Sequence, residues 1–251
     1  MYRWVPAYVK KVIFMAQNYK RILLKLSGER LGGQDGEVLK QQQLEMLAQE
    51  AHALRDAGYE LAIVLGGGNI LRGKEAAENG IEEAQAHHMG MLATVINSIA
   101  LQSVMEQRGL ETRVMTAINM EDVAEPYIRR RAIRHLEKGR VVICAAGTGN
   151  PFFTTDSAGA LRAIEMGADV LIKATKVDGI YTADPFKDAT AQHIPRISYK
   201  QTLVDDLHVM DGSAVALCRD NHMPLMVCNL AGDSSILKAL RGDAKHTLVD
   251  N

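Results

Sequence analysis

Short aliphatic runs alternate along this chain with longer segments in which apolar residues recur every three or four positions. The first run, 21–26, reads RILLKL and ends at a Ser-Gly pair, which is typical of a buried strand leading into a turn. The segment 41–57 then carries apolar or small residues on one helical face and ends at Gly58. Those residues are Leu44, Leu47, Ala48, Ala51 and Leu54. The pattern predicts a strand followed by an amphipathic helix.

The same alternation continues to the end of the chain. It predicts strands over 61–65, 112–116, 140–145, 170–173, 225–229 and 246–249, and helices over 83–108, 126–138, 156–166, 212–221 and 234–240. Asp156 and Asp211 stand at the starts of two of these helices, where an aspartate N-cap contributes about 1 kcal/mol. The alternation predicts an α/β fold, a three-layer αβα sandwich with a central, mostly parallel sheet and ligands at the carboxyl ends of its strands.

No internal repeat, low-complexity tract or proline-rich linker divides the chain, so we expect one α/β domain over residues 19–251. Residues 1–18 mix Arg3, Lys10 and Lys11 with scattered apolar side chains, without a clean apolar stretch before a small-residue cleavage site. We interpret this segment as a loosely ordered tail or an artefact of start-site choice, with Met15 as the alternative start.

The composition narrows the classes of partner. Of the 251 residues, 47% are hydrophobic and 24% are charged, and the formal net charge is −1. No long basic block is present, so neither nucleic acid nor a membrane is expected as a partner. No apolar run reaches the ~18 residues that span a bilayer. Cys144, Cys218 and Cys228 lie in apolar neighbourhoods without metal-ligand spacing, which predicts buried, reduced thiols in a cytoplasmic protein.

Three predicted strands end in unusual loops. Residues 25–29 read KLSGE, residues 66–69 read GGGN with Arg72 close behind, and residues 147–156 read GTGNPFFTTD. Glycines permit close backbone approach and positive φ, so N–H groups can converge on phosphate oxygens. One such loop alone is more often a plain turn. Three together, with Lys25 and Arg72 to stabilise a transferring phosphoryl group, favour phosphate binding over simple surface solvation of the two cations.

Other nucleotide-binding signatures are missing from the sequence. It contains no G-x-x-x-x-G-K-[ST] loop, no G-x-G-x-x-G between a strand and a helix, and no HRD or DFG set. A kinase with this sequence is therefore neither a Walker-type enzyme nor a protein kinase.

From about residue 19 to residue 249 the motifs resemble those of the bacterial uridylate (UMP) kinases, in the amino-acid kinase superfamily. The motifs are KLSGE at 25–29, GGGNxxRG at 66–73, HMGMLAT at 88–94, GTGNPFFTTD at 147–156 and KATKVDGIYTADP at 173–185. The first and last occur across the superfamily, whereas GTGNPFFTTD and HMGMLAT are similar to the uridylate branch in particular. The resemblance implies the amino-acid kinase fold and transfer of the ATP γ-phosphate to UMP, giving UDP and ADP in pyrimidine nucleotide biosynthesis.

The resemblance also implies roles for individual residues. The implied catalytic set is Lys25, Arg72 and Asp156, with Asp156 orienting the cations. The implied ATP contacts are Lys25, Leu26, Ser27, Gly28, Gly68, Arg72, Thr175, Tyr181 and Asp184. The implied UMP contacts are Gly67, His87, Thr148, Gly149, Asn150, Pro151, Phe152, Phe153, Thr154 and Thr155. A turn closed by Asp184 and Pro185 is a structural explanation of that stretch, compatible with the ATP role.

The family also implies a cofactor, an assembly and effectors. Mg²⁺ is expected to arrive with ATP, since it keeps several waters and bridges phosphates, and no metal site of the protein's own is expected. A homohexamer and regulation by GTP or UTP are implied. Arg113 and Arg140 match the GTP surface, but the loop that the family writes GFG reads Gly36-Glu37-Val38 here.

One position departs from the family, because His87 stands where these kinases carry an acid that takes the ribose hydroxyls. A carboxylate accepts two hydroxyl hydrogen bonds, while neutral imidazole offers one acceptor and one donor. We therefore expect weaker UMP binding that is sensitive to pH between about 5.5 and 7.5. A one-residue shift that brings Glu82 or Glu83 to the ribose is the alternative. Metal binding by His87 and His88 is not expected, because adjacent helical residues do not face one site.

Two other functions fit part of the pattern. An amino-acid or carbamate kinase would share the Lys25 loop and the GIYTADP segment but not GTGNPFFTTD. A non-catalytic nucleotide-binding protein on the same fold would explain His87, yet a decayed enzyme would be expected to lose Lys25 or Arg72.

Overall fold

A computed structural model describes residues 19–33, 37–72, 78, 80–205, 207, 209–230 and 235–251. The predicted tail, residues 1–18, and Gly36 of the GFG-equivalent loop lie outside the described residues. Within the described part no helix is long and apolar enough to cross a membrane.

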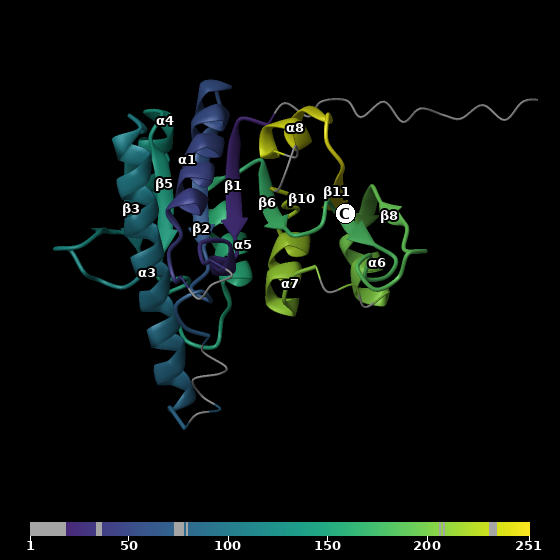
Figure 1. Ribbon diagram of the computed structural model, residues 1–251, viewed down its shortest axis with the longest axis horizontal. Helices are drawn as coiled ribbons and strands as arrows, with labels where there is room; N and C mark the ends of the chain where they lie inside the picture. The colour runs from purple at the N-terminus through teal and green to yellow at the C-terminus, as the bar shows by residue number, and fades with distance from the viewer. Residues whose placement is uncertain are drawn as a thin grey trace, which may run out of the picture.

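A nine-stranded sheet runs through the described residues in the order β4-β3-β5-β2-β1-β6-β10-β11-β9 (Figure 1). Neighbouring strands are parallel except for the antiparallel pair β10–β11. The strands are β1 Arg21–Leu26, β2 Glu60–Leu65, β3 Thr112–Thr116, β4 Glu125–Pro126, β5 Val141–Ala145, β6 Val170–Thr175, β9 Arg196–Ser198, β10 Leu225–Asn229 and β11 His246–Asp250. A separate antiparallel pair joins β7 Ile180–Tyr181 to β8 His193–Ile194.

Helices cover both faces of the sheet. Side chains of β1 alternate between two cores, because Ile22, Leu24 and Leu26 join one cluster and Leu23 joins the other. The first cluster includes α1 Gln41–Asp56, α3 Glu83–Gln107 and α8 Ile236–Arg241, and the second includes α4 Arg129–Glu137, α5 Thr155–Met166, α6 Tyr199–Val204 and α7 Gly212–Asp220. The predicted three-layer αβα sandwich is confirmed.

Most predicted elements agree with the structure to within two residues at each end, and the differences are short elements. The helix predicted from residue 126 begins at Arg129, because Glu125–Pro126 pairs with β3 as the edge strand β4. The 3-10 helix Gly28–Arg30, the strands β7, β8 and β9, and the helix α6 were not predicted, since elements of two to six residues carry too little periodicity. Cys144, Cys218 and Cys228 are buried and free, as predicted.

The prediction that Asp156 is the N-cap of its helix is wrong. Thr154 caps α5, and its Oγ1 accepts the Asp156 N–H at 3.0 Å. The Asp156 side chain instead lies between two lysines of neighbouring strands, which attract it more strongly than a backbone amide does. The other predicted cap is confirmed, because Asp211 Oδ1 accepts the Ala214 N–H of α7 at 2.9 Å.

Candidate active site

The glycine-rich loops that follow β1 and β2 lie against each other at the carboxyl edge of the sheet. A Cβ built on Gly28 would lie 2.5 Å from the Gly66 carbonyl oxygen, and one on Gly66 would lie 2.8 Å from the Gly28 nitrogen. Real Cβ atoms do not approach backbone so closely, so only glycine fits at either position. Two of the predicted phosphate-binding loops thus form one continuous backbone surface.

We call the loop after β1 the first loop and the loop after β2, which begins at Gly66, the second loop. Helix α3 packs on the second loop at the HMGMLAT motif. A Cβ on Gly67 would lie 2.8 Å from both the Ala93 Cβ and the Gly90 carbonyl oxygen. Asn97, one turn further along α3, donates to the Gly66 carbonyl at 2.7 Å. In Figure 1 the first turns of α3 extend beyond the carboxyl end of β1. The motif therefore has a packing role, which is to hold the Gly67 loop against the helix.

Two lysines and one aspartate form a partly buried cluster at this edge. Lys25 Nζ lies 2.6 Å from Asp156 Oδ1, a contact with the geometry of an ion pair rather than of an aligned hydrogen bond. Lys173 Nζ donates to Asp156 Oδ2 at 2.8 Å and to the Val209 carbonyl at 2.5 Å. The side chains of Lys25, Asp156 and Lys173 are 12%, 13% and 19% exposed. We name these three residues the lysine–aspartate cluster.

The sheet register and the α5 helix bring the cluster together. Lys25 and Lys173 are direct partners in the parallel β1–β6 pairing, so their side chains emerge side by side on the α5 face. Gly159 of α5 leaves room for the Lys25 stem, because a Cβ there would lie 3.4 Å from Lys25 Cγ. Asp156 comes from the first turn of α5, where a negative charge is favoured by the helix dipole.

The charges within the cluster shift the pKa values of its members. Burial alone would raise the pKa of Asp156, but Lys25 and Lys173 outweigh burial and hold that pKa below its usual range. Burial lowers the pKa of Lys173, and Asp156 opposes that shift. Asp156 is therefore a carboxylate at neutral pH, and it fixes two ammonium groups in one place.

Lys173 was missed as a site residue from the sequence. It opens the KATKVDGIYTADP motif, and it is the single charged position in the strand VLIKAT. That lone charge in an otherwise apolar strand was the available signal. Only the β1–β6 pairing shows that it faces Lys25, because strand pairing across almost 150 residues cannot be read from local pattern.

Arg72, predicted to be catalytic, follows the second loop and pairs with Glu29 of the first. Lys176 Nζ also approaches Glu29, at 3.9 Å. Gly68 lies beside this pair, since a Cβ on it would lie 3.9 Å from both Arg72 Cγ and Glu29 Cγ. The predicted phosphate contacts Leu26, Ser27, Gly28 and Gly68 thus surround the junction of the two loops.

The predicted adenosine contacts are each engaged locally. Thr175, at the end of β6, closes a turn with the residue two positions ahead. The Tyr181 hydroxyl on β7 donates to Asp178, and this bond raises the pKa of Tyr181 to about 12. Asp184 accepts a backbone N–H two residues on, so the turn predicted at Asp184-Pro185 is confirmed.

Seven of the ten predicted UMP contacts line one cavity of about 290 Å³. We name it the acceptor cavity. It lies between the first turns of α3, the second loop and residues 147–155. The seven residues are Gly67, His87, Thr148, Asn150, Phe153, Thr154 and Thr155. The remaining three, Gly149, Pro151 and Phe152, belong to the same loop.

The loop 147–153 has an unusual backbone. Gly147 and Gly149 have φ of +58° and +83°, and Phe152 adopts φ of +69°, which non-glycine residues rarely do. The Phe152 side chain projects beside His87, with the ring centroids 5.2 Å apart and tilted by 55°. His87 Nε2 lies 4.0 Å from Glu83, one turn earlier on α3. Of the alternatives Glu82 and Glu83, Glu83 thus lies nearer to the position expected to meet the ribose, although neither lines the cavity.

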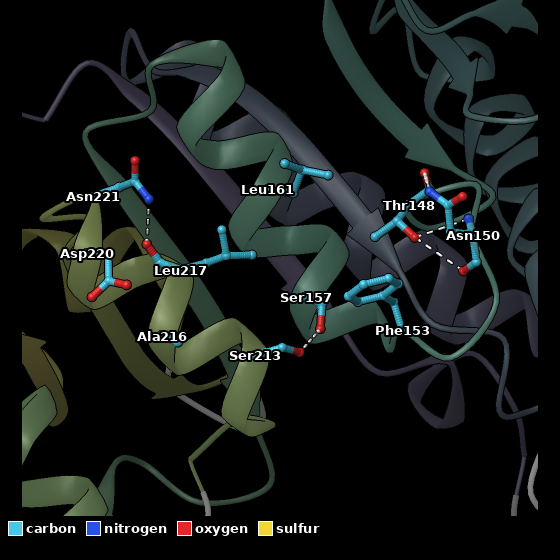
Figure 2. A pocket seen from close by; sticks show the side chains of 10 residues that line it. All are labelled: Thr148, Asn150, Phe153, Ser157, Leu161, Ser213, Ala216, Leu217, Asp220 and Asn221. Carbon is cyan, nitrogen blue, oxygen red and sulfur yellow. Dashed lines mark hydrogen bonds between the residues drawn. The ribbon is translucent and has the colours of Figure 1, made fainter.

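A second, larger cavity of about 510 Å³ lies between α5 and α7. Figure 2 shows Phe153 beside α5, opposite the segment that carries Thr148 and Asn150, with a hydrogen bond between the Ser157 and Ser213 hydroxyls joining the two helices. Thr148, Asn150 and Phe153 line both cavities, so the loop 147–153 forms a wall between them. The smaller cavity, unlike the larger one, is lined by Gly67 and by Thr154 and Thr155 at the start of α5.

The chemistry available at this edge is phosphoryl transfer. Backbone amides of glycine loops, a helix N-terminus and fixed ammonium groups are the groups that stabilise phosphate charge. Across the residues that the structure describes, no three His, Cys, Asp or Glu side chains gather as ligands for a metal ion. Both oxygens of Asp156 face lysines, so that carboxylate is committed to the cluster.

Known proteins are similar to this chain in sequence and in fold. Residues 20–229 match the model of the amino acid kinase family. The chain is 56% identical to the uridylate kinase of Methylococcus capsulatus over 225 residues, 90% of this chain and 94% of that protein. It is 54% identical to the uridylate kinase of Hyphomonas neptunium over 233 residues, 92% of each.

Solved structures of UMP kinases have a fold similar to that of this chain. The UMP kinase from Bacillus anthracis matches with a TM-score of 0.89 and 40% identity, over 93% of this chain and 97% of that one. The UMP kinase from Ureaplasma parvum matches with a TM-score of 0.89 and 34% identity, over 94% and 100%. With its parallel sheet, glycine loops and sequence in agreement, the chain belongs to the amino acid kinase family, among the uridylate kinases.

Proposed function

We propose that the protein transfers the γ-phosphate of ATP to UMP, giving UDP and ADP in pyrimidine nucleotide biosynthesis. The observation that carries the proposal is the lysine–aspartate cluster beside two fused glycine loops and a cavity lined by residues of the GTGNPFFTTD motif. The relatives named uridylate or UMP kinases support UMP as the acceptor.

In the proposed reaction the protein positions and stabilises charge and forms no covalent bond to substrate. Asp156 pairs with both Lys25 and Lys173 and so holds them close together. Both ammonium groups donate hydrogen bonds to the oxygens of the phosphoryl group during its transfer. Because Asp156 stays ionised, it holds both ammonium groups in place before substrate binds, which lowers the reorganisation needed in the transition state. Arg72 adds a cation from the second loop.

The acceptor side orients UMP toward that cluster. In this proposal, backbone N–H groups at Gly67 and at Thr154 and Thr155, where α5 starts, donate to the UMP phosphate, and the loop 147–153 encloses the uracil. His87 lies at the α3 side of the same cavity, and in this proposal it meets the ribose.

Mg²⁺ in this proposal comes with ATP. It would supply charge neutralisation at the phosphates, with waters rather than a protein cage as most of its ligands. The residues present fit this arrangement, because Asp156 is committed to two lysines and Glu29 pairs with Arg72 and Lys176.

An assay of ADP release with different acceptors tests the proposal. We expect turnover with UMP and Mg-ATP, weaker turnover with CMP, and none with glutamate or carbamate. Turnover with glutamate or carbamate but not UMP would move the protein to another branch of the family. ATP binding without UDP formation would identify a non-catalytic nucleotide-binding protein.

We also propose a homohexamer. An exposed apolar stripe on α3 supports association, because Met89, Leu92, Ile96 and Ile99 recur at intervals of three or four residues on the outer face of this helix. A helix face of this kind is usually covered by another chain. Sedimentation of the wild type and of Ile96→Glu checks it, with smaller species expected for the variant and an unchanged mass contradicting this interface.

Regulation by GTP or UTP completes the proposal. Arg113, Arg140 and His135 gather near Glu125, which pairs with His135 at 3.2 Å and with Arg113 at 3.7 Å. A phosphate-bearing effector would bind these cations in place of their carboxylate partners, which are Glu125 for Arg113 and Glu111 for Arg140. We further propose one catalytic domain over 19–251 and a cytoplasmic location, which the three free, buried cysteines support.

A further inference from the structure

The acceptor cavity has a single ionisable side chain among the described residues that line it, and that side chain is an imidazole. The other lining residues are glycines, apolar residues, threonines and one asparagine. Among the described residues no carboxylate lines the cavity, and Glu83, which lies 4.0 Å from His87, is 69% exposed in its side chain. The part of the cavity next to α3 is therefore built around His87.

His87 has limited hydrogen-bonding capacity for a sugar. A carboxylate accepts from two neighbouring hydroxyls at once, whereas a neutral imidazole has one donor and one acceptor on opposite sides of the ring. The Nε2 side of His87 faces Glu83 at 4.0 Å, and the ring lies beside Phe152. The 4.0 Å separation from Glu83 is too long for a hydrogen bond. Because the two ring nitrogens point to opposite sides, this side chain cannot bind both oxygens of a vicinal diol.

We infer that the acceptor site takes 2′-deoxyuridine monophosphate as well as UMP, so that the protein has a second activity giving dUDP. This inference rests on the proposed function. The bond between the γ-phosphorus and its bridging oxygen breaks, an oxygen of the acceptor phosphate bonds to that phosphorus, and ADP leaves. Carbon 2′ takes no part, so the same groups catalyse both reactions.

The expected preference for UMP over dUMP depends on which protein groups lose a partner when the 2′-hydroxyl is absent. A site that buries polar groups for a substrate hydroxyl rejects the analogue without it by about 10⁴- to 10⁵-fold, because those groups are left unpaired. His87 is 30% exposed in its side chain, so water reaches it when the hydroxyl is missing. Loss of one neutral hydrogen bond then corresponds to about two- to tenfold. The difference is expected in KM, since His87 is not part of the lysine–aspartate cluster.

Steady-state kinetics with UMP and dUMP test the inference. We measure kcat and KM for the wild type, His87→Asp, His87→Asn and the neighbouring control His88→Asp. The wild type is expected to prefer UMP by about tenfold or less in kcat/KM. His87→Asp is expected to raise that preference at least tenfold by lowering the KM for UMP alone. His87→Asn keeps one donor and one acceptor and is expected to keep the wild-type ratio, as is His88→Asp.

Two results overturn the inference while leaving the proposed function intact. The first is a wild type that converts UMP but prefers it over dUMP by well above about tenfold, toward the 10⁴- to 10⁵-fold of a site built for the hydroxyl. The second is a UMP-to-dUMP ratio that stays at the wild-type value in His87→Asp. Absence of turnover with UMP as well would overturn the proposed function together with the inference.

Discussion

The lysine–aspartate cluster and the loop 147–153 lie at the same edge of the sheet but are built differently. The cluster comes from two paired strands and a helix, and its side chains are held by mutual ion pairs with little exposure. The loop carries three residues at positive φ, and its Phe152 side chain is 63% exposed. In the proposed reaction, rigid elements position the charges that act on the phosphoryl group, while an irregular loop shapes the acceptor pocket.

The difference predicts two kinds of mutational effect. Changes in the cluster should reduce turnover for every acceptor and disturb the fold, because its charges depend on each other. Changes in the loop or at His87 should act on particular acceptors and leave the fold nearly intact.

The largest effect is expected from Asp156→Asn. Removing this carboxylate leaves two neighbouring ammonium groups with little water and no counter-charge, which is expected to cost about 3–5 kcal/mol of unfolding free energy. Urea denaturation at pH 7 measures it. Asp220→Asn is the control, because Asp220 pairs with Arg219 at the surface, and little change is expected there. Equal effects of the two substitutions would contradict a cluster held by Asp156.

The stability difference between the wild type and Asp156→Asn is also expected to depend on pH. The pKa of Asp156 is lowered in the folded state, so its ionised form stabilises the fold above the unfolded value of about 3.9. That contribution is lost as the pH falls through the folded pKa. The stability difference between the wild type and Asp156→Asn should therefore be constant between about pH 5 and 7 and shrink below about pH 4. A difference that grows toward low pH would reverse the assigned sign.

Lys25→Ala and Lys173→Ala are expected to lower kcat about 100- to 1000-fold each, the usual loss when one preorganised donor is removed from a transition state. The effect should be the same with UMP and dUMP. Lys20→Ala is the matched control, since Lys20 is exposed and pairs with Glu60 away from the loops. If kcat fell in Lys25→Ala but stayed at the wild-type value in Lys173→Ala, Lys173 would not be a catalytic residue.

The effect of Gly67→Ala is expected to lie between the effects of the cluster variants and that of Phe152→Gly. The new methyl group would lie 2.8 Å from the Gly90 carbonyl, so the second loop and α3 must move apart, at a cost of about 1–3 kcal/mol and a higher KM for UMP. Gly212→Ala serves as control, because a Cβ there meets no atom within 4 Å. A Gly67→Ala protein with wild-type stability and KM would show that this close approach is not needed.

Phe152→Gly should have the smallest effect on the fold. Glycine relieves a positive φ that costs about 1 kcal/mol, so stability is expected to hold or rise, while the KM for UMP increases because the ring beside His87 is lost. Phe186→Gly removes another exposed phenylalanine that is not among the positive-φ residues, and it should not stabilise. Greater destabilisation by Phe152→Gly than by Phe186→Gly would contradict a strained loop.

The sequence predicted the elements with strong periodicity, the αβα layers and the three glycine loops, because these depend on local pattern. It did not predict that the Asp156 side chain pairs with lysines instead of capping α5. Thr154, two residues earlier, supplies the cap, and the two lysines that pair with Asp156 come from strands that are distant in the sequence. Lys173 was missed for the same reason, because its position opposite Lys25 depends on strand register. Seven of the predicted UMP contacts line one cavity, so the motifs group these residues in space, while their contact with UMP stays a prediction.

The most direct test of the account is the formation of UDP from UMP and Mg-ATP, followed by ³¹P NMR in the wild type and in Lys25→Ala. The account predicts one UDP for each ADP in the wild type and a rate lower by about 100- to 1000-fold in the variant. Wild-type protein that forms no UDP, or a Lys25→Ala variant with undiminished turnover, would contradict it.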